Sequence, residues 1–390
     1  MLPAREFCIP PVVVTGAGSS GRVGEHCLRL GLKKGLIVTD KVMAGLGILD
    51  GIRKALEQDN VSYAVYDGVA AEPTIDFVRE GLQAYRENGC DFLLAVGGGS
   101  PIDTAKAIGV MVSNPGSIEE YRGAGKVRKK GAPLLAIPTT AGTGSEVTRF
   151  TVITDTRTNV KMLIASPYII PDVAIVDPLL TLSCPPGLTA TVAIDALTHA
   201  IEAYVSVKAQ PLSDIFCLSA IGLISGSLRQ AWADAQNVEA REKTMLGALQ
   251  AGIAFSNSSV ALVHGMSRPI GAYFHVAHGA SNAALLGVVT DFSLAGNPGR
   301  YARIAAAMGE DISGLSDEEA ARRGAEAVNK LIRDVEVPSL RELGVDQARL
   351  EELAPRMTED AIASGSPANN PRQATKQEII ELYRKAYDVK

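Results

Sequence analysis

The chain has 390 residues, of which 46% are hydrophobic and 21% charged, and it carries a formal net charge of −5 at pH 7. This length allows two domains, the composition is that of a soluble globular protein, and the negative charge argues against nucleic-acid binding. The five cysteines never occur in C-x-x-C spacing, which predicts free thiols in a reducing compartment. No apolar stretch reaches the roughly 18 residues of a membrane span, and the N-terminus does not resemble a signal peptide. We therefore expect a cytoplasmic protein without a membrane contact.

Up to about residue 180, short apolar runs alternate with helical patterns. The runs that predict strands are 35–40, 62–69, 91–100 and 133–140, and the segments that predict helices are 74–89 and 101–112. This alternation predicts a mostly parallel sheet covered by helices. Ligands of such sheets bind beyond the carboxyl ends of the strands, so the loops that follow the strands are the expected positions of a site.

Two glycine-rich loops are candidates for binding a pyrophosphate. The first contains Gly16, Gly18 and Gly21 in G-x-G-x-x-G spacing after a β-branched run, and Asp40 follows at the end of the next strand. This is close to the Rossmann spacing of about 20 residues. The same motif is compatible with a turn that only requires small residues, so for this loop both interpretations stay open.

The second loop lies in the sequence AVGGGSPIDTAKA. Its glycines, Gly97, Gly98 and Gly99, let the backbone approach a phosphate closely. Ser100 suits the N-cap of a helix and Pro101 its first position. A helix that begins here points its free N–H groups and its dipole at an anion. This loop is the stronger candidate of the two.

A third loop, IPTTAGTGSEVT, follows the predicted strand 133–140. It carries four hydroxyl side chains, those of Thr139, Thr140, Thr143 and Ser145. Such hydroxyls can bind a polar cofactor or substrate, or they can satisfy the backbone of the loop itself. From the residues alone both alternatives remain.

The composition changes near LSCPPG, where two prolines interrupt any regular element. We place the boundary at residues 183–187 and divide the chain into an α/β domain, 1–184, and an all-helical domain, 185–390. Helical patterns dominate the second domain; examples are 189–206, 213–232, 238–254 and 317–333, with a last helix near 375–387. The sequence SGSPANNPR, residues 364–372, predicts a loop.

The histidines suggest a metal site because the chain has only five of them. Asp195 and His199 are four residues apart on a predicted helix, so they share a face that is otherwise apolar. Either they pair with each other, or both bind a divalent metal. His264 and His278, each followed by glycine, would complete a set of one carboxylate and three imidazoles with an open position. A set without sulfur suits Fe²⁺ or Zn²⁺.

Taken together, GGGSPIDTAKA, AIPTTAGTGSEVT, DALTHAIEAY, HGMSRPIGAYFHVAHG and the late NNPR resemble the iron-containing (group III) alcohol dehydrogenases. The motifs occur in the order of that family and extend over nearly the whole chain. The resemblance implies a dinucleotide-binding α/β domain followed by a helical metal-binding domain. It further implies NAD, a divalent metal (Fe²⁺ in the first place, Zn²⁺ as the alternative), a small alcohol or aldehyde substrate, and a homodimer or higher homo-oligomer.

The resemblance also assigns individual residues. It places the pyrophosphate on Gly97, Gly98, Gly99 and Ser100, which makes the first glycine motif a decoy. Asp40 matches an acidic residue at the adenosine ribose, where a carboxylate repels a 2′-phosphate and favours NAD over NADP. The other expected cofactor contacts are Asp103, Thr139, Thr140, Thr143, Ser145 and Lys161. The expected metal ligands are Asp195, His199, His264 and His278. Phe255 matches a bulky residue near the nicotinamide and the substrate.

Arg268 departs from the family pattern. Many members carry a histidine there, near the open metal position, and an arginine stays charged and cannot shuttle protons. We therefore expect His275, water or a cofactor hydroxyl to act as acid and base. Arg268 either binds an acidic group of the substrate or has a structural partner. The alternative enzyme class is an NAD- and metal-dependent lyase of the dehydroquinate synthase type.

Overall fold

The computed structural model describes residues 4–70, 72–158 and 160–388. The chain forms two compact units, Met1–Thr140 with Gly144–Leu182, and Ala141–Thr143 with Ser183–Lys390. The first unit is built on a parallel sheet and the second from helices, which confirms the expected fold class.

The main sheet of the first unit has six strands in the order β1-β9-β6-β4-β2-β3, and every pairing in it is parallel. The strands are β1 (Val12–Thr15), β2 (Lys34–Val38), β3 (Ser62–Tyr66), β4 (Phe92–Gly97), β6 (Leu134–Pro138) and β9 (Val173–Val176). The central strand β4 is buried along its whole length. This is expected of a parallel strand that is covered on both faces.

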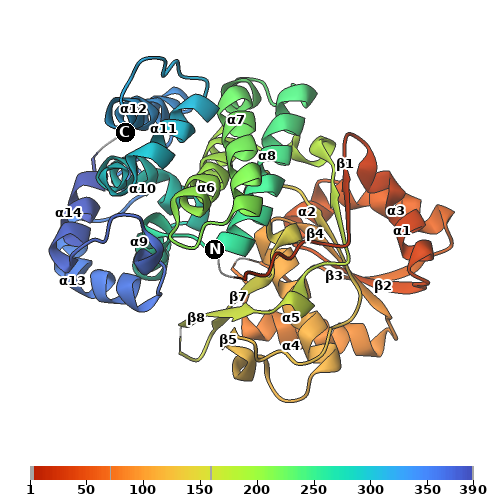
Figure 1. Cartoon of the computed structure of the whole chain (residues 1–390). Helices are drawn as coiled ribbons and strands as arrows, with labels where there is room; N and C mark the ends of the chain where they lie inside the picture. Colours follow the sequence, from red (N-terminus) through yellow and green to blue (C-terminus); the bar gives the residue numbers. More distant parts are fainter. Residues whose placement is uncertain (1–3, 71, 159, 389–390) are drawn as a thin grey trace. The chain divides into compact units, whose positions relative to one another are not determined.

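Helices cover both faces of this sheet (Figure 1). On one face lie α1 (Val23–Arg29) and α3 (Ile48–Gln58), and on the other lie α4 (Ile75–Glu87) and α5 (Gly99–Ser113). Residues of one strand alternate between the two cores: Leu93 packs under α4 and α5, whereas Leu94 packs under α1 and α3. The helix α2 (Lys41–Gly45) follows β2.

The strand order fixes where a ligand can bind. Without β1, the order is that of a flavodoxin-like sheet. In such a sheet the first and third strands are neighbours, and successive strands are added on opposite sides of this point, which is called the switch point. Here these strands are β2 and β4. Asp40 follows β2 and Gly97 ends β4, so both candidate cofactor residues lie at this switch point. The edge strand β1, with the first glycine motif, lies at the far side of the sheet.

A second, three-stranded sheet was not predicted. It contains β5 (Gly123–Ala124), β7 (Phe150–Asp155) and β8 (Val160–Ala165), and β7 pairs antiparallel with β8. In β7 every second residue is buried, the pattern of a strand with one covered face. Such a strand has no continuous apolar run, and continuous runs were the signal on which the predicted strands rested.

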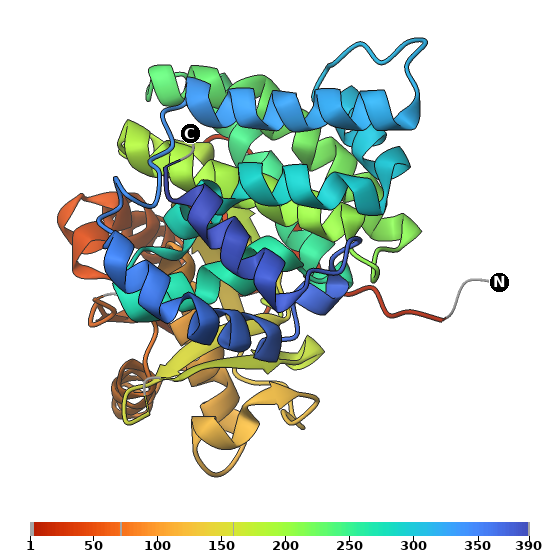
Figure 2. The ribbon, with the colours of Figure 1, turned by 90° about the vertical axis from the view of Figure 1, so that its left-hand side faces the viewer.

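The second unit is a stack of long helices (Figure 2). They are α6 (Pro186–Val205), α7 (Pro211–Ala233), α8 (Val238–Ser258), α9 (Leu262–Phe274), α10 (His278–Ser293), α11 (Pro298–Ala307), α12 (Asp317–Asp334), α13 (Gln347–Ala363) and α14 (Lys376–Ala386). By length and composition α7 could cross a bilayer. It packs instead against α6 and α8 in the core of this unit.

Candidate metal and dinucleotide sites

The second glycine loop connects β4 to α5 in the expected way, with one correction. The helix begins at Gly99, so Gly98 is its N-cap and Ser100 and Pro101 lie in its first turn. Gly97 has φ +146°, and a Cβ there would come within 2.7 Å of Pro101 Cγ. Only glycine fits this position without strain. The loop therefore exposes the N-terminus of α5 at the switch point of the sheet, as a phosphate site requires.

The first glycine loop is already filled by a side chain. The carboxylate of Asp177, just after β9, accepts hydrogen bonds from the backbone N–H groups of Gly18 and Ser20, each at 3.0 Å, and from Ser20 Oγ at 2.6 Å. It also accepts from Leu179 N at 3.0 Å. The donors that would bind a phosphate thus bind an anion of the chain itself, which supports the expectation that the pyrophosphate binds at the other loop.

Asp40 lies where β2 ends and is partly exposed. Its Oδ1 accepts a hydrogen bond from Met43 N at 2.9 Å, so Asp40 is the N-cap of α2. This bond fixes the carboxylate beside the switch point of the sheet. The local structure therefore gives Asp40 a structural role in addition to the one expected at a ribose.

Asp103 and Ser145 belong to a buried polar network, which we call the lysine cluster: Asp103, Lys106, Ser145 and Thr148. Lys106 donates to Ser145 Oγ at 3.1 Å, to Thr148 Oγ1 at 2.9 Å and to the backbone oxygen of Phe150 at 2.8 Å. Ser145 in turn donates to Asp103 Oδ1 at 2.5 Å. Burial lowers the pKa of Lys106 to about 8 and raises that of Asp103. Lys106 was not among the site residues predicted from the sequence.

The remaining expected cofactor residues lie as follows. Thr139 Oγ1 is 3.3 Å from Met43 Sδ, and Thr140 Oγ1 lies near Gly98, so both follow β6 at the switch-point end of the sheet. Thr143 groups with the second unit. Lys161, on β8, forms an ion pair with Glu72.

The four expected metal ligands are brought together inside the second unit. Asp195 and His199 lie on α6, His264 on α9, and His278 at the first position of α10 (Figure 1). One ligand atom from each lies within 4.8 Å of the others. Asp195, His199 and His264 are at most 4% exposed. We call these four residues the metal cluster.

His199 is buried in a way that leaves one ring nitrogen available. Burial lowers the pKa of its ring well below the ordinary value, so the imidazole is neutral and keeps a free lone pair. Its Nδ1 is buried and has no hydrogen-bond partner among the described residues. Phe255 stacks on this ring with the centroids 4.2 Å apart. The expected role of Phe255 thus includes holding His199 in place.

Glu202 is a functional residue that no sequence pattern indicated. It lies on α6 close to His199, and its Oε2 is 2.7 Å from His264 Nδ1. The same carboxylate accepts hydrogen bonds from Ala261 N at 2.9 Å and Val263 N at 2.5 Å. It therefore caps the N-terminus of α9 and makes His264 Nδ1 the protonated nitrogen. His264 Nε2 is then free to bind a metal, as in many metal sites.

Arg268 lies one turn after His264 on α9 and donates to Ser366 Oγ at 3.0 Å. Ser366 precedes a short helix, η7 (Pro367–Asn369), in the segment that the sequence predicted to be a loop. Burial lowers the pKa of the Arg268 guanidinium, which nevertheless stays charged. His275 is exposed and ends α9 with φ 57°.

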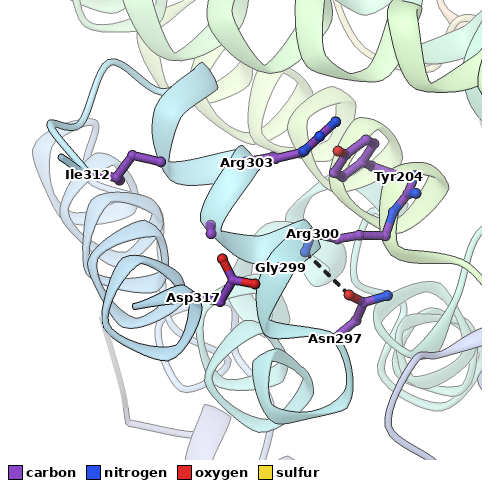
Figure 3. A pocket seen from close by; sticks show the side chains of 8 residues that line it. Tyr204, Asn297, Gly299, Arg300, Arg303, Ile312 and Asp317 are labelled. Carbon is purple, nitrogen blue, oxygen red and sulfur yellow. Dashed lines mark hydrogen bonds between the residues drawn. The ribbon is translucent and has the colours of Figure 1, made fainter. Parts of the chain in front are cut away.

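The second unit also contains a hollow of about 500 Å³ between α11, α12 and the end of α6 (Figure 3). Arg300, in its wall, lies over the ring of Tyr204 at 3.9 Å and donates to Asp214 at 2.5 Å. None of the metal cluster lines this hollow. Arg300 is therefore engaged in packing and an ion pair.

Comparison with known proteins identifies the family of the chain. Residues 10–178 match the family described as iron-containing alcohol dehydrogenase, and residues 189–387 match the C-terminal domain of the Fe-containing alcohol dehydrogenase family. The chain is 40% identical to a lactaldehyde reductase of Escherichia coli K12, over 95% of this chain and 97% of that one.

Two solved structures are similar as well. The crystal structure of a 1,3-propanediol oxidoreductase superposes with a TM-score of 0.96 at 40% identity, covering 99% of this chain and 100% of that one. A sulfoacetaldehyde reductase from Bifidobacterium kashiwanohense, in complex with NAD⁺, superposes with a TM-score of 0.89 at 29% identity, covering 100% of both chains. The chain therefore belongs to the iron-containing alcohol dehydrogenase family and is an alcohol/aldehyde oxidoreductase.

Proposed function

We propose that Asp195, His199, His264 and His278 bind one divalent metal ion, Fe²⁺ in the first place and Zn²⁺ as the alternative. The observation that carries this proposal is the convergence of four ligand atoms within 4.8 Å in a buried site. One carboxylate and three imidazoles without sulfur suit either ion. When bound, such an ion acts as a Lewis acid that polarises a carbonyl or stabilises an alkoxide.

We further propose that NAD binds at the switch point of the sheet, with its pyrophosphate on Gly97, Gly98, Gly99 and Ser100. The exposed N-terminus of α5 supports this assignment. Asp40 would accept a hydrogen bond from the ribose and repel a 2′-phosphate. Asp103, Thr139, Thr140, Thr143, Ser145 and Lys161 complete the proposed cofactor site. NAD bound there would supply hydride transfer to or from the substrate carbon, a chemistry that belongs to the cofactor.

The proposed substrate is a short aldehyde or alcohol that carries an acidic group. Arg268 supports this, because it places a fixed positive charge one turn from His264. The hydrogen bond to Ser366 uses Nη1, and the bidentate geometry of a guanidinium suits a carboxylate or sulfonate. The likeness to a sulfoacetaldehyde reductase also favours an acidic substrate. In this proposal Phe255 supports His199, and His275 or water supplies the proton.

A metal and activity assay tests the proposed function. The wild-type protein should retain one divalent ion per chain through dialysis and oxidise NADH with an aldehyde panel that includes succinic semialdehyde, sulfoacetaldehyde and propanal. His264→Ala should lose the ion and turnover while still binding NADH. His26→Ala, a buried histidine of the first unit, is the control. Full activity of His264→Ala would refute the metal site, and a preference for propanal would refute the acidic substrate.

We also propose that the protein is a cytoplasmic homo-oligomer. Val207, Leu212 and Ile215, at the start of α7 and just before it, are 58%, 54% and 67% exposed, and such an apolar group favours a protein contact. Light scattering measures the mass in solution. Replacing Ile215 by lysine should reduce it, whereas a monomeric wild type would contradict the proposal.

A further inference from the structure

Asn282 lies in the middle of the metal cluster, although no metal-site pattern includes it. It is on α10, one turn after His278, and its side chain is fully buried. Its amide nitrogen is 2.7 Å from Asp195 Oδ1, 3.1 Å from His264 Nε2 and 3.1 Å from His278 Nε2. One amide nitrogen thus contacts ligand atoms of three members of the cluster.

The surrounding atoms determine which end of the amide faces the cluster. Asp195 Oδ1 only accepts hydrogen bonds, and so does His264 Nε2, because Glu202 requires the proton of that ring on Nδ1. An amide oxygen in this position would face these acceptors without a hydrogen between them. The NH₂ group must therefore face the cluster, and Oδ1 is left buried without a hydrogen-bond partner among the described residues.

The NH₂ group carries two hydrogens and faces three ligand atoms, whereas a divalent ion can bind a lone pair of each of the three at once. The amide and the ion would thus interact with the same lone pairs of His264 and His278. The contact with Asp195 is different, because a carboxylate has lone pairs for both.

We propose that the amide of Asn282 binds the metal ligands when no metal ion is bound to them. In the metal-free protein its NH₂ group holds the ligand atoms of Asp195, His264 and His278 in position, and on metal binding it gives up the two imidazoles and keeps Asp195. Asn282 is thus a positioning residue that holds the ligand atoms in the metal-free protein and competes weakly with the ion for them. This inference rests on the proposed metal site.

The proposal makes a specific statement about stability. Replacing Asn282 removes three contacts from the metal-free protein but only one from the metal-bound protein. The variant should therefore be destabilised more without metal than with it, and the rise in melting temperature that saturating Zn²⁺ produces should be larger than in the wild type, by about 2 °C or more. A residue that only packs would lower both melting temperatures equally.

The experiment compares this Zn²⁺-induced shift in the wild type, Asn282→Ala, Asn282→Asp and Asn370→Ala. Asn370 is an equally buried asparagine whose amide bonds Ser293 and Arg372, so its variant should keep the wild-type shift. Asn282→Asp retains the side-chain volume, which guards against a folding failure of the alanine variant. Its carboxylate would repel Asp195 without the ion, so its shift should be the largest.

Visible absorption of the Co²⁺-substituted proteins excludes a rival role. If Asn282 leaves the imidazoles and does not bind the ion, Asn282→Ala should keep the d–d spectrum of the wild type. If the Zn²⁺-induced rise in melting temperature of Asn282→Ala equals that of Asn370→Ala, the proposal is overturned. So would a smaller shift together with a changed spectrum, because Asn282 would then be a metal ligand. Equilibrium dialysis tests the metal site separately: a wild type that takes up no Zn²⁺ refutes both the site and the role of Asn282.

Discussion

The lysine cluster of the first unit and the metal cluster of the second are both buried groups of hydrogen-bond acceptors, and they differ in the origin of their cation. In the lysine cluster the ammonium group of Lys106 meets three oxygen atoms, so the chain supplies its own positive charge. In the metal cluster the ligand atoms converge on an amide and on each other, and we propose that the positive charge comes from a metal ion. Buried acceptors require a cation or a donor in both cases.

The largest effect is expected from a change in the lysine cluster, and this loss of unfolding free energy should not depend on metal. Lys106→Met removes the only cation of the lysine cluster and leaves Asp103 and the hydroxyl oxygens without it. The two charges belong to one buried network bridged by Ser145 and attract each other, and removing one charge of such a buried arrangement costs about 3–5 kcal/mol of unfolding free energy. Urea unfolding should show the loss equally with and without a chelator. Exposed Lys54→Met should cost little, and a loss that disappears with the chelator would contradict the comparison.

A smaller effect is expected in the metal cluster. Glu202→Gln keeps the size of the side chain but removes the negative charge that orients His264. Loss of such a partner lowers metal affinity by about 10- to 100-fold, which a competition assay with a chromophoric chelator measures. Glu239→Gln, an exposed change on α8, is the control. Unchanged affinity of Glu202→Gln would show that the carboxylate serves only as the cap of α9.

The metal cluster and its neighbours Glu202 and Asn282 also show what the sequence could and could not predict. The four metal-cluster residues were predictable because histidine is rare in this chain and two ligands are four apart on one helix. Glu202 and Asn282 were not, because they act through contacts with those ligands across three helices, which no local spacing records. In the fold, continuous apolar runs revealed β2, β4 and β6, whereas the half-covered strands β7 and β8 have a weaker pattern. Pro269 lies inside the helix α9, and an internal proline weakens the helical pattern of a segment.

The buried carboxyl of Glu146 predicts how the unfolding free energy of the protein depends on pH. Burial raises the pKa of this carboxyl to about 7, so the folded state favours its protonated form. The resulting stability is complete below the unfolded pKa of about 4.3 and is lost as the pH rises through about 7. Glu146→Gln should therefore be more stable than the wild type at pH 8, by on the order of 2 kcal/mol, and similar at pH 4. Parallel urea curves at both pH values measure this, and an equal difference at both would contradict it.

The smallest expected effect concerns Asp40. Asp40→Gly removes the repulsion of a 2′-phosphate and should raise kcat/KM for NADPH relative to NADH by about tenfold, or roughly 1.4 kcal/mol. It also removes the cap of α2 and so lowers stability by about 1 kcal/mol. A wild type that already prefers NADPH would show that the carboxylate does not face the ribose.

The carboxylate of Asp177 has a consequence for protein engineering. It ties the first glycine loop to the end of the first unit, and β1 pairs with β9 over the same stretch. The beginning and the end of this unit are therefore adjacent and joined. A truncated chain that begins at residue 11 keeps the joint, whereas one that begins at residue 22 leaves the Asp177 carboxylate without its partners from the loop and exposes the edge of β9. Because the two ends meet, the unit is suited to circular permutation, with a short linker that connects them directly.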